Sequence, residues 1–449
     1  MRIFKCIHQF LPKHVAGSEI HTYRLCKELM KRHAVHLFYP EHYDDRGPYQ
    51  VRSGDFEGIP FTEFSYSAGA VDFSQTYRNA RIEELFLEAF ERFRPDVFHI
   101  QHLFFMTPRL IHLARERGVP VVMTLHEYGA MCPAGGLRMR PDYQLCHDIR
   151  HEQCADCLLD SPYVFRGPLA GLPRFEQIQL RACRNLRKMF ETCGLGRWVP
   201  ADPALAAARD RDAFMRECFA KVDLFLAPSR FLMEKYLEWG IHPDKIMYKD
   251  YGFDTAELLA VTREPAEIAR FGYIGSVMPH KGVDVLVRAF NRLADSTAEL
   301  RIFGEPSYHP PFYKSLQAEA RHPGIRFEGF LPADRIPQAY SRIDALIVPS
   351  RWFENSPLTL HEALLAGVPV ITSDLGGMKE LITPGVNGLL FKTGDVDDLH
   401  RALQEYLTHQ DRFKPSDIRN SMEIIDFRDY VNAVERLYER LVDGCSAPK

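Results

Sequence analysis

The chain has 449 residues, of which 46% are hydrophobic and 26% charged, and its formal net charge at pH 7 is −4. This length and composition predict a globular protein with two domains of roughly 200 residues each. The charge balance shows no basic excess, which argues against a nucleic-acid partner, and no stretch approaches the ~20 apolar residues of a membrane span.

The start of the chain and its cysteine content bear on the cellular compartment. Residues 1–7 predict a short strand and lack the apolar run and cleavage site of a signal peptide. The ten cysteines do not indicate a secreted disulfide framework in a chain of this length. We therefore expect a cytoplasmic protein.

Strand and helix patterns alternate along most of the chain, which predicts an α/β fold with parallel sheets covered by helices. In the first half, we expect strands at 2–8, 34–39, 96–102 and 120–125, and helices at 18–32, 77–94 and 108–117. In the second half, we expect strands at 271–275, 300–304, 325–330, 345–348 and 369–372. The helix after residue 282 places its apolar residues on one face with a period of 3.6.

Two segments, 223–231 and 344–352, share a pattern of Asp, four mostly apolar residues, Pro-Ser-Arg and an aromatic residue. Each predicts a strand followed by a helix that begins at its serine, Ser229 or Ser350. We interpret them as equivalent positions in two Rossmann-like halves. A coincidence between two common strand–helix junctions is the alternative.

The stretch from Glu354 to Glu362 places two carboxylates across a predicted loop-to-helix junction. Ser356 suits the N-cap and Pro357 the first helical position, and Gly367 is expected to end the helix. Free N–H groups at such a helix start bind anions, so a ligand with a central phosphate and hydroxyl groups at both ends, such as a nucleotide sugar, would fit. The alternative is an ordinary helix start, where the dipole favours acidic residues.

The segment 349–380, with the run Glu354-Asn-Ser-Pro-Leu-Thr-Leu-His-Glu362, closely resembles the signature of family 4 glycosyltransferases. The resemblance covers most of the chain and is densest over 271–391. It implies the GT-B fold, in which two Rossmann-like domains with parallel sheets face an interdomain cleft. It also implies a retaining enzyme that moves a sugar from a nucleoside-diphosphate sugar, UDP- or GDP-linked, to an acceptor hydroxyl in glycan or polysaccharide assembly.

From the doubled pattern of strands and helices we place the domain boundary near residue 250. By the resemblance, residues 1–250 would form an N-terminal acceptor domain and 251–425 a nucleotide-sugar-binding domain, while the last helix, within 426–449, would pack back on the N-terminal domain. Residues 129–215 are too long for an α/β connection and are interpreted as an insertion that governs the choice of acceptor.

Roles for individual residues follow from the same resemblance. Glu354 would hold hydroxyls of the donor sugar near the anomeric carbon, and Glu362 would bind the ribose hydroxyls. Backbone N–H groups of Leu358 and Thr359 would bind the diphosphate, with charge added by Lys281. The stretch containing Gly376, Gly377 and Glu380 matches another that the family places at the cleft.

The loop 273–282 joins a strand to a helix and offers glycines and Lys281 to a phosphate group. Its glycine spacing fits neither a dinucleotide-binding nor a Walker motif, which disfavours an NAD dehydrogenase or an NTPase. A simple turn is the alternative. Ser276 stands where the family usually has a donor-binding arginine, and His280 and Arg351 are the candidates to replace that charge.

Two further candidates lie in the first half. Gly17 opens the first helix, where the family has a glycine-rich loop near the donor phosphate and acceptor, although Ala16 replaces one glycine. His126 follows a predicted strand, at the carboxyl edge where open α/β sheets bind ligands, and the matching family histidine lies near the reacting sugar. A plain turn and a structural histidine are the alternatives. Glu127 is a second candidate at this strand end, unless it only caps the next turn.

The insertion carries two more patterns. Cys132, Cys146, Cys154 and Cys157 suit a tetrahedral structural zinc ion, with free thiols or a disulfide as alternatives. We expect no metal in catalysis, because GT-B enzymes do not generally use one on the donor diphosphate. The insertion also has a basic set that could contact anionic lipid at the membrane, as for a lipid-linked saccharide acceptor, unless it is a solvated helix face. This set comprises Arg181, Arg184, Arg187, Lys188 and Arg197.

Two other function classes remain open. One is another GT-B enzyme, such as a nucleotide-sugar epimerase or a sugar phosphorylase. The other is a catalytically silent partner subunit, which Ser276 favours and the intact pair Glu354 and Glu362 disfavours.

Overall fold

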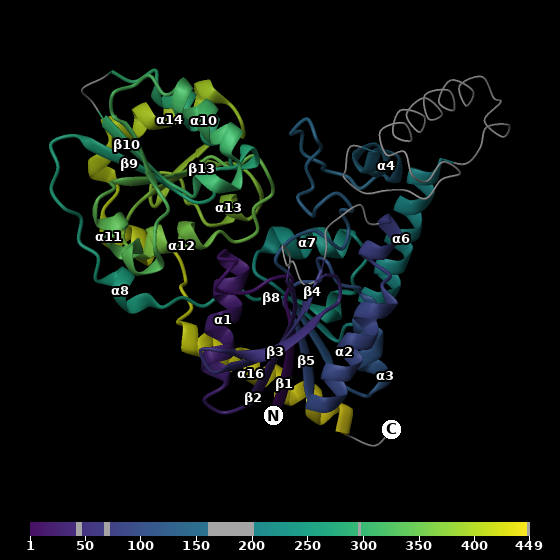
Figure 1. Cartoon of the computed structure of the whole chain (residues 1–449). Coiled ribbons are helices and arrows are strands. Elements are labelled where there is room, and N and C mark those ends of the chain that lie inside the picture. The colour runs from purple at the N-terminus through teal and green to yellow at the C-terminus, as the bar shows by residue number, and fades with distance from the viewer. Residues whose placement is uncertain (42–46, 67–71, 160–201, 295–297, 447–449) are drawn as a thin grey trace. The chain divides into compact units, whose positions relative to one another are not determined.

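The computed structural model describes residues 1–41, 47–66, 72–159, 202–294 and 298–446 (Figure 1). It divides into two compact units. The first unit comprises Met1–Ala227, Met233–Lys249 and Val431–Lys449, and the second comprises Pro228–Leu232 and Asp250–Tyr430.

The second unit includes a short segment, Pro228–Leu232, that the sequence-based boundary at residue 250 assigns to the first domain. The reason is local hydrogen bonding within the second unit. Ser229 Oγ donates to Asn355 Oδ1 at 2.8 Å, and the backbone N–H of Arg230 donates to the Glu380 carboxylate at 2.9 Å. These bonds hold the segment to residues more than a hundred positions later in the chain.

The first unit contains a sheet built around its earliest strands. The strands are β1 (Arg2–Cys6), β2 (Ala34–Glu41), β3 (Val51–Phe56), β4 (Ile59–Ser65), β5 (Val97–Ile100), β6 (Val121–Thr124), β7 (Leu224–Ala227) and β8 (Ile246–Tyr248). Among the described residues their order is β3-β4-β2-β1-β5-β6-β7-β8. Neighbouring strands are parallel except β3 and β4, which are antiparallel.

Helices cover both faces of this sheet. Since successive residues of a strand point to opposite faces, neighbouring residues of β1 contact different helices. Phe4 of β1 packs edge-on against Phe86 of α2, with ring centroids 5.7 Å apart. The next residue, Lys5, lies on the other face with His99 of β5, whose ring meets Tyr438 of α16. The helices are α1 (Gly17–Leu29), α2 (Ala80–Phe93), α3 (Arg109–Glu116), α4 (His151–Leu159), α6 (Pro203–Phe219), α7 (Arg230–Glu238) and α16 (Phe427–Ser446), with short turns η1 (Phe73–Thr76) and η3 (Pro243–Lys245).

The second unit contains a fully parallel sheet among its described residues, in the order β11-β10-β9-β12-β13-β14. Its strands are β9 (Ala269–Ile274), β10 (Ala298–Phe303), β11 (Ile325–Gly329), β12 (Ala345–Val348), β13 (Val370–Ser373) and β14 (Gly388–Phe391). Its helices are α8 (Thr255–Leu259), α9 (Val283–Phe290), α10 (Pro310–Glu319), α11 (Ile336–Ser341), α12 (Leu358–Leu365), α13 (Gly376–Glu380), α14 (Val396–Thr408) and α15 (Pro415–Asn420), with turns η4 (Pro279–Lys281), η5 (Pro306–Tyr308), η6 (Ala333–Arg335) and η7 (Gln410–Arg412).

The predicted α/β fold with parallel sheets is confirmed, and each expected strand and helix is present near its predicted place except the helix predicted to begin at Ser350. The interpretation of the two echoing segments is wrong. Strand β12 lies next to β9, the first strand of its sheet, whereas β5 and β6 separate β7 from β1. Ser229 does cap α7 by accepting from the N–H of Leu232 at 3.2 Å, but after Ser350 the chain continues as a loop until Leu358.

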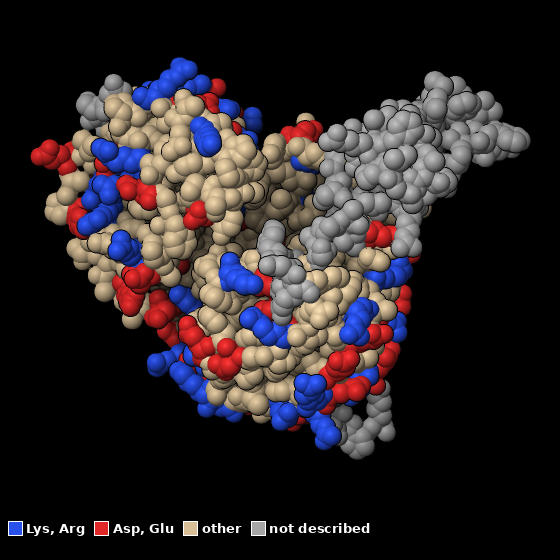
Figure 2. Space-filling model, in the orientation of Figure 1, with Lys and Arg blue, Asp and Glu red and all other residues tan. Residues whose placement is uncertain are grey.

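The surface of the described residues carries both charge signs. Lys and Arg side chains are intermixed with Asp and Glu over the face shown in Figure 2, in keeping with the net charge of −4. Within the described ranges, no helix combines the length and apolar character that crossing a bilayer requires. The predicted basic set of the insertion, residues 181–197, lies outside the described residues.

Candidate functional site

The loop between β12 and α12 holds Glu354 in a fixed position. The residue is 7% exposed, and its Oε1 atom accepts three hydrogen bonds. The donors are Lys281 Nζ at 2.6 Å, Trp352 Nε1 at 2.7 Å and Ser350 Oγ at 2.9 Å. Such a set of partners leaves the carboxylate little freedom to rotate. Sequence reasoning named Glu354 and Lys281 but missed Ser350 and Trp352, although both lie in the same Pro-Ser-Arg-Trp run.

Lys281 reaches Glu354 because its loop packs tightly against the end of β12. Gly282 has a φ of 70°, and a Cβ atom there would lie 1.9 Å from the carbonyl oxygen of Pro349. The N–H of Arg351 donates to the carbonyl oxygen of His280 at 2.8 Å. Glycine is therefore required at 282 for both its backbone conformation and the close approach.

The two candidates for replacing the missing arginine at Ser276 do not supply a spare positive charge. The guanidinium of Arg351 forms an ion pair with Asp284. Burial and the nearby charge of Lys281 lower the pKa of His280 to about 4, so its ring is neutral at pH 7. Lys281 is the cation of this loop that faces Glu354.

Helix α12 begins one residue later than predicted. Pro357 takes the N-cap position, and the Ser356 hydroxyl donates to Asp250 at 2.7 Å, so the prediction that Ser356 caps the helix is wrong. Among the described residues no side chain caps this end. The half-buried Leu358 and Thr359 form the first turn, whose N–H groups have no partner inside the helix. The helix start therefore has the character of an anion site.

Glu362 projects from the second turn of α12 and is half-buried. The hydroxyl of Tyr340 lies 3.3 Å from its Oε2 atom and 2.8 Å from the carbonyl oxygen of Thr359. Burial and then the charge of Glu362 raise the pKa of Tyr340, so the phenol remains a hydrogen-bond donor. Tyr340, which sequence reasoning missed, orients Glu362.

The glycine pair after β13 packs on the backbone of this loop. The N–H of Gly377 donates to the carbonyl oxygen of Glu354 at 3.0 Å, and a Cβ at Gly377 would lie 1.6 Å from the carbonyl oxygen of Asn355. Glu380 instead accepts from the backbone N–H groups of Arg230 and Phe231 at the start of α7. Gly377 thus supports Glu354, and Glu380 caps a helix.

In the first unit, His126 follows β6 as predicted. Its Nε2 atom lies 3.0 Å from Gln101 Oε1, so the Nε2–H donates to that amide oxygen. Burial and then the charge of Lys5 lower the pKa of His126 to about 3. At neutral pH the side chain is therefore an uncharged hydrogen-bonding group. Gln101, which directly follows the neighbouring strand β5, was not identified as a candidate site residue from the sequence.

A buried polar chain extends from Gln101 toward α16. The Gln101 amide nitrogen lies 3.0 Å from His99 Nε2, and His99 Nδ1 lies 2.5 Å from the Tyr438 hydroxyl and 2.9 Å from Lys5 Nζ. Burial lowers the pKa of Lys5 to about 8. Because His99, Lys5 and Tyr438 are fully buried, this chain links α16 firmly to the strand ends.

The first unit contains two further candidates from the sequence, Gly17 and Glu127. Gly17 is exposed and is the first residue of α1. Glu19, in the same helical turn, is fully buried and accepts from Gln9 Nε2 at 2.8 Å. Glu127 accepts from the backbone N–H of Gly129, and burial raises its pKa to about 8. Glu127 therefore caps the turn that follows it.

Comparison with known families decides the class of the protein. Residues 16–252 match the model of the Glycosyl transferase 4-like domain, and residues 254–422 match that of Glycosyl transferases group 1. The chain belongs to this glycosyltransferase family. The resemblance found from the sequence is thus confirmed.

Curated relatives of this glycosyltransferase match parts of it. Lipopolysaccharide 1,6-galactosyltransferase of Salmonella typhimurium is 29% identical over 231 residues, which cover 49% of this chain and 63% of that one. D-inositol 3-phosphate glycosyltransferase of Kribbella flavida is 30% identical over 191 residues, covering 38% and 44%. The matches thus span less than two thirds of each relative.

Solved structures show the fold over the whole length. Sucrose-phosphate synthase from Thermosynechococcus elongatus has a TM-score of 0.69 at 16% identity, with 99% of both chains covered. Anabaena HepE in complex with UDP has a TM-score of 0.61 at 16% identity, with 98% of this chain and all of that chain covered. The glycosyltransferase therefore has the GT-B fold.

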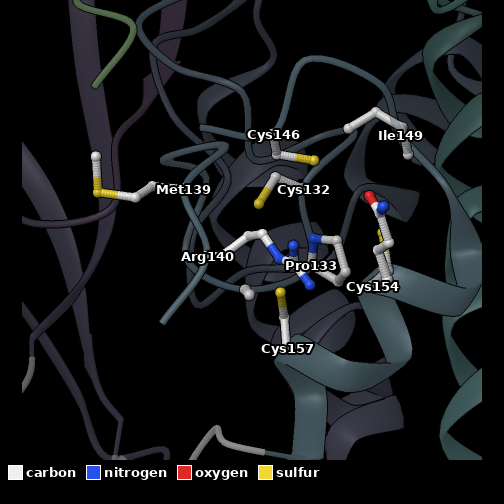
Figure 3. Close-up of a pocket in the computed structure, with 10 residues that line it drawn as sticks. Cys132, Pro133, Met139, Arg140, Cys146, Ile149, Cys154 and Cys157 are labelled. Atoms are coloured by element: carbon white, nitrogen blue, oxygen red, sulfur yellow. The ribbon is translucent and has the colours of Figure 1, made fainter. Parts of the chain in front are cut away.

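The four predicted zinc ligands of this glycosyltransferase lie around one cavity. Cys132, Cys146, Cys154 and Cys157 all line it (Figure 3). Burial and the neighbouring thiols raise the pKa of Cys154 to about 12 and that of Cys157 to about 11, so these two carry protons in this state. As the side chains stand, no group of three or more His, Cys, Asp or Glu residues within the described ranges is placed to hold a metal ion.

Proposed function

We propose that this protein transfers a sugar from a nucleoside-diphosphate sugar to an acceptor hydroxyl in glycan assembly. The observation that carries the proposal is the pairing of Lys281 with Glu354, in the same unit as the uncapped start of α12 and Glu362. A cation, free N–H groups and two oriented carboxylates are the groups needed to bind a diphosphate between two sets of hydroxyls.

The donor roles follow from these positions. Glu362, oriented by Tyr340, would accept hydrogen bonds from the ribose hydroxyls. Leu358 and Thr359 would donate backbone N–H groups to the diphosphate, and Lys281 would turn from Glu354 toward it. Glu354, held by Ser350 and Trp352, would then accept from hydroxyls of the donor sugar.

Chemistry at the anomeric carbon requires stabilisation of the departing nucleoside diphosphate while an acceptor hydroxyl attacks an oxocarbenium-like centre. Fixed N–H dipoles and Lys281 supply that stabilisation without reorganising at the moment of reaction. We propose retention of configuration by attack on the same face of the sugar. Glu354, whose Oε1 atom already accepts three hydrogen bonds, would hold sugar hydroxyls and would not attack the anomeric carbon. His126 would contribute as a neutral hydrogen-bonding group.

The substrates are proposed from the relatives. One structural neighbour is complexed with UDP, and another curated relative is a GDP-mannose-dependent mannosyltransferase, so a UDP- or GDP-linked donor is proposed. The lipopolysaccharide galactosyltransferase supports a saccharide or lipid-linked saccharide as acceptor. Such an acceptor would involve peripheral contact with a membrane. No metal is proposed for the catalytic step.

A panel of UDP, GDP, ADP and their common sugar conjugates tests the donor site by thermal shift. A ligand that binds only the folded protein raises its melting temperature by mass action. We expect one nucleotide family to stabilise the wild type and the control Glu405→Ala, on α14, but not Glu362→Ala. Equal stabilisation of all three proteins would contradict the proposed role of Glu362.

A catalytically silent subunit is the second candidate, favoured by Ser276 and by the pairing of Arg351 with Asp284. Turnover separates the two proposals. Release of the nucleoside diphosphate from the stabilising conjugate, with and without saccharide acceptors, indicates an active enzyme. Stabilisation by a conjugate that is never consumed would indicate a silent subunit.

A further inference from the structure

Four cysteines that lie far from the proposed donor residues in the chain meet at one place in the first unit. Cys132 and Cys146 come from a loop, and Cys154 and Cys157 lie three residues apart on α4, hence on the same helical face. All four line a cavity of about 20 Å³, which is room for a single water-sized or ion-sized occupant. In Figure 3, the Cys132 and Cys157 side chains point toward each other, whereas the Cys146 sulfur is turned away from them, in line with its hydrogen bond to Asp148.

The backbone around the cavity is held in place by buried arginines. Arg138 is 2% exposed, and its guanidinium donates to the carbonyl oxygens of Cys146 and His147. The N–H of Cys146 in turn donates to the carbonyl oxygen of Arg138 at 2.8 Å. Arg211 of α6 donates to the carbonyl oxygens of Gly129 and Ala130, just before Cys132. These bonds fix the backbone near Cys132 and Cys146.

Helix α4 packs against α6 through a small apolar cluster of described residues. Ala155 and Leu159 of α4 form this cluster with Ala204 of α6. The loop between β6 and α4 has only an isolated bridge between Met139 and Leu145 as regular structure. A loop with so little regular structure gains stability from a cross-link such as a disulfide or a bound metal. None of the seven described cysteine side chains forms a disulfide, so the four thiols around the cavity are available as metal ligands.

We propose that Cys132, Cys146, Cys154 and Cys157 bind one structural zinc ion. The Cys146 thiol donates to the carbonyl oxygen of Asp148 at 3.0 Å and so is turned to the backbone. Rotation about its Cα–Cβ bond would bring the sulfur to the cavity. Binding exchanges four S–H protons, released to solvent, for four Zn–S bonds, and leaves a site with two net negative charges.

The surroundings suit that charge. Arg140 lines the same cavity, and Figure 3 shows its side chain between Cys132 and Cys157. With Arg138 beside Cys146, it places two guanidinium groups next to the proposed anionic cluster. Positive neighbours stabilise thiolates and hence metal binding.

Metal analysis of the full-length chain, loaded with zinc and then dialysed, tests the proposal. We expect one zinc ion per wild-type chain and background levels in Cys132→Ser and Cys157→Ser. Cys218→Ala, which removes a buried thiol of α6 that does not line the cavity, should keep the ion. Because a variant could lose zinc by failing to fold, Cys157→His, which restores a zinc ligand, should recover it.

Two results would overturn the proposal. The first is a folded wild type that retains no zinc, or a Cys132→Ser, Cys157→Ser double variant that keeps it. The second is a pair of disulfides among these cysteines, detected as missing thiols in a denatured, unreduced and metal-free sample. Cobalt substitution adds a direct readout, since four thiolate ligands give intense sulfur-to-cobalt absorption. None of these measurements depends on the donor nucleotide or on transfer activity.

Discussion

Lys281 Nζ lies 2.6 Å from Glu354 Oε1, so the cation proposed to bind the donor diphosphate is paired with the carboxylate proposed to bind the donor sugar. The lysine side chain is 24% exposed and the glutamate side chain 9%. The lysine can therefore turn outward, whereas Glu354 stays in place through Ser350 and Trp352. If Lys281 binds the donor diphosphate as proposed, a bound diphosphate would compete with Glu354 for this lysine. The two residues would then have opposite effects on nucleotide binding.

Substitution of the two residues should separate those effects. Lys281→Ala should weaken binding of the stabilising nucleoside diphosphate about 10- to 100-fold, because a charge-assisted hydrogen bond is lost. Glu354→Gln should tighten binding of that sugar-free diphosphate, since it frees Lys281, yet slow sugar transfer by about 100-fold or more. Calorimetry gives the dissociation constants and nucleotide release gives the rates. Weaker diphosphate binding by Glu354→Gln would show that Glu354 and the diphosphate do not compete for Lys281.

Restoring the family's arginine tests whether the 273–282 loop faces the diphosphate. Arg351 is occupied by Asp284 and His280 is neutral, so Ser276→Arg would add a charge that this loop lacks. We expect donor binding to tighten about tenfold, in line with one added charge-assisted hydrogen bond. Ser276→Ala, the matched control, should leave the dissociation constant unchanged. Unchanged binding by Ser276→Arg would place the phosphates elsewhere.

The sequence predicted the parts of the site that lie in one continuous motif. Glu354 and Glu362 are eight positions apart on a loop and its helix, so their neighbourhood follows from local structure. Gln101 and His126 are 25 positions apart, and His99 and Tyr438 are 339 apart, so their contacts depend on strand order and on the docking of α16. No local pattern encodes such distances.

The ends of helices, the boundary between the units and the hydrogen-bond partners of side chains were less predictable than the strands and helices themselves. The reason is again that they depend on long-range contacts. Ser356 has the chemistry of an N-cap, but Asp250, more than a hundred residues earlier, takes its hydroxyl. The antiparallel pair β3 and β4 was not predicted, although the parallel strands around it were. Long-range hydrogen bonds thus override the local N-cap preference of Ser356. They also assign Pro228–Leu232 to the second unit.

Gln101 is proposed to position His126, and its amide offers a conservative test. Gln101→Leu removes the acceptor of the His126 Nε2–H, so we expect kcat to fall about tenfold from loss of one hydrogen bond. Gln101→Glu keeps an acceptor oxygen and should restore part of the rate. Thermal shift by the donor nucleotide should be the same in both variants, because Gln101 belongs to the first unit. A loss of nucleotide binding in Gln101→Leu would instead indicate general misfolding.

The pair His361 and Asp250 in the second unit should make stability depend on pH. His361 Nε2 lies 3.0 Å from Asp250 Oδ2, and the histidine is 2% exposed. Burial acts to lower the pKa of His361, but the charge and hydrogen bond of Asp250 outweigh it and raise that pKa above 6.5. The folded protein thus binds this proton more tightly than the unfolded chain does. The stabilisation is fully present below about pH 6.5 and is lost as pH rises through the raised pKa.

Asp250→Asn removes the charge while keeping an oxygen for the Ser356 hydroxyl, so it isolates this effect. We expect the variant to be less stable than the wild type by about 1.5–3 kcal/mol at pH 5.5, with a smaller difference at pH 8.5. Melting temperatures of both proteins across this range give the comparison, and titrations elsewhere in the chain cancel between them. His242→Gln, which changes an exposed histidine, should show no such trend. A stability difference that grew with pH would contradict this prediction. It would mean that His361 is neutral in the folded protein and that its contact with Asp250 does not depend on the charge of Asp250.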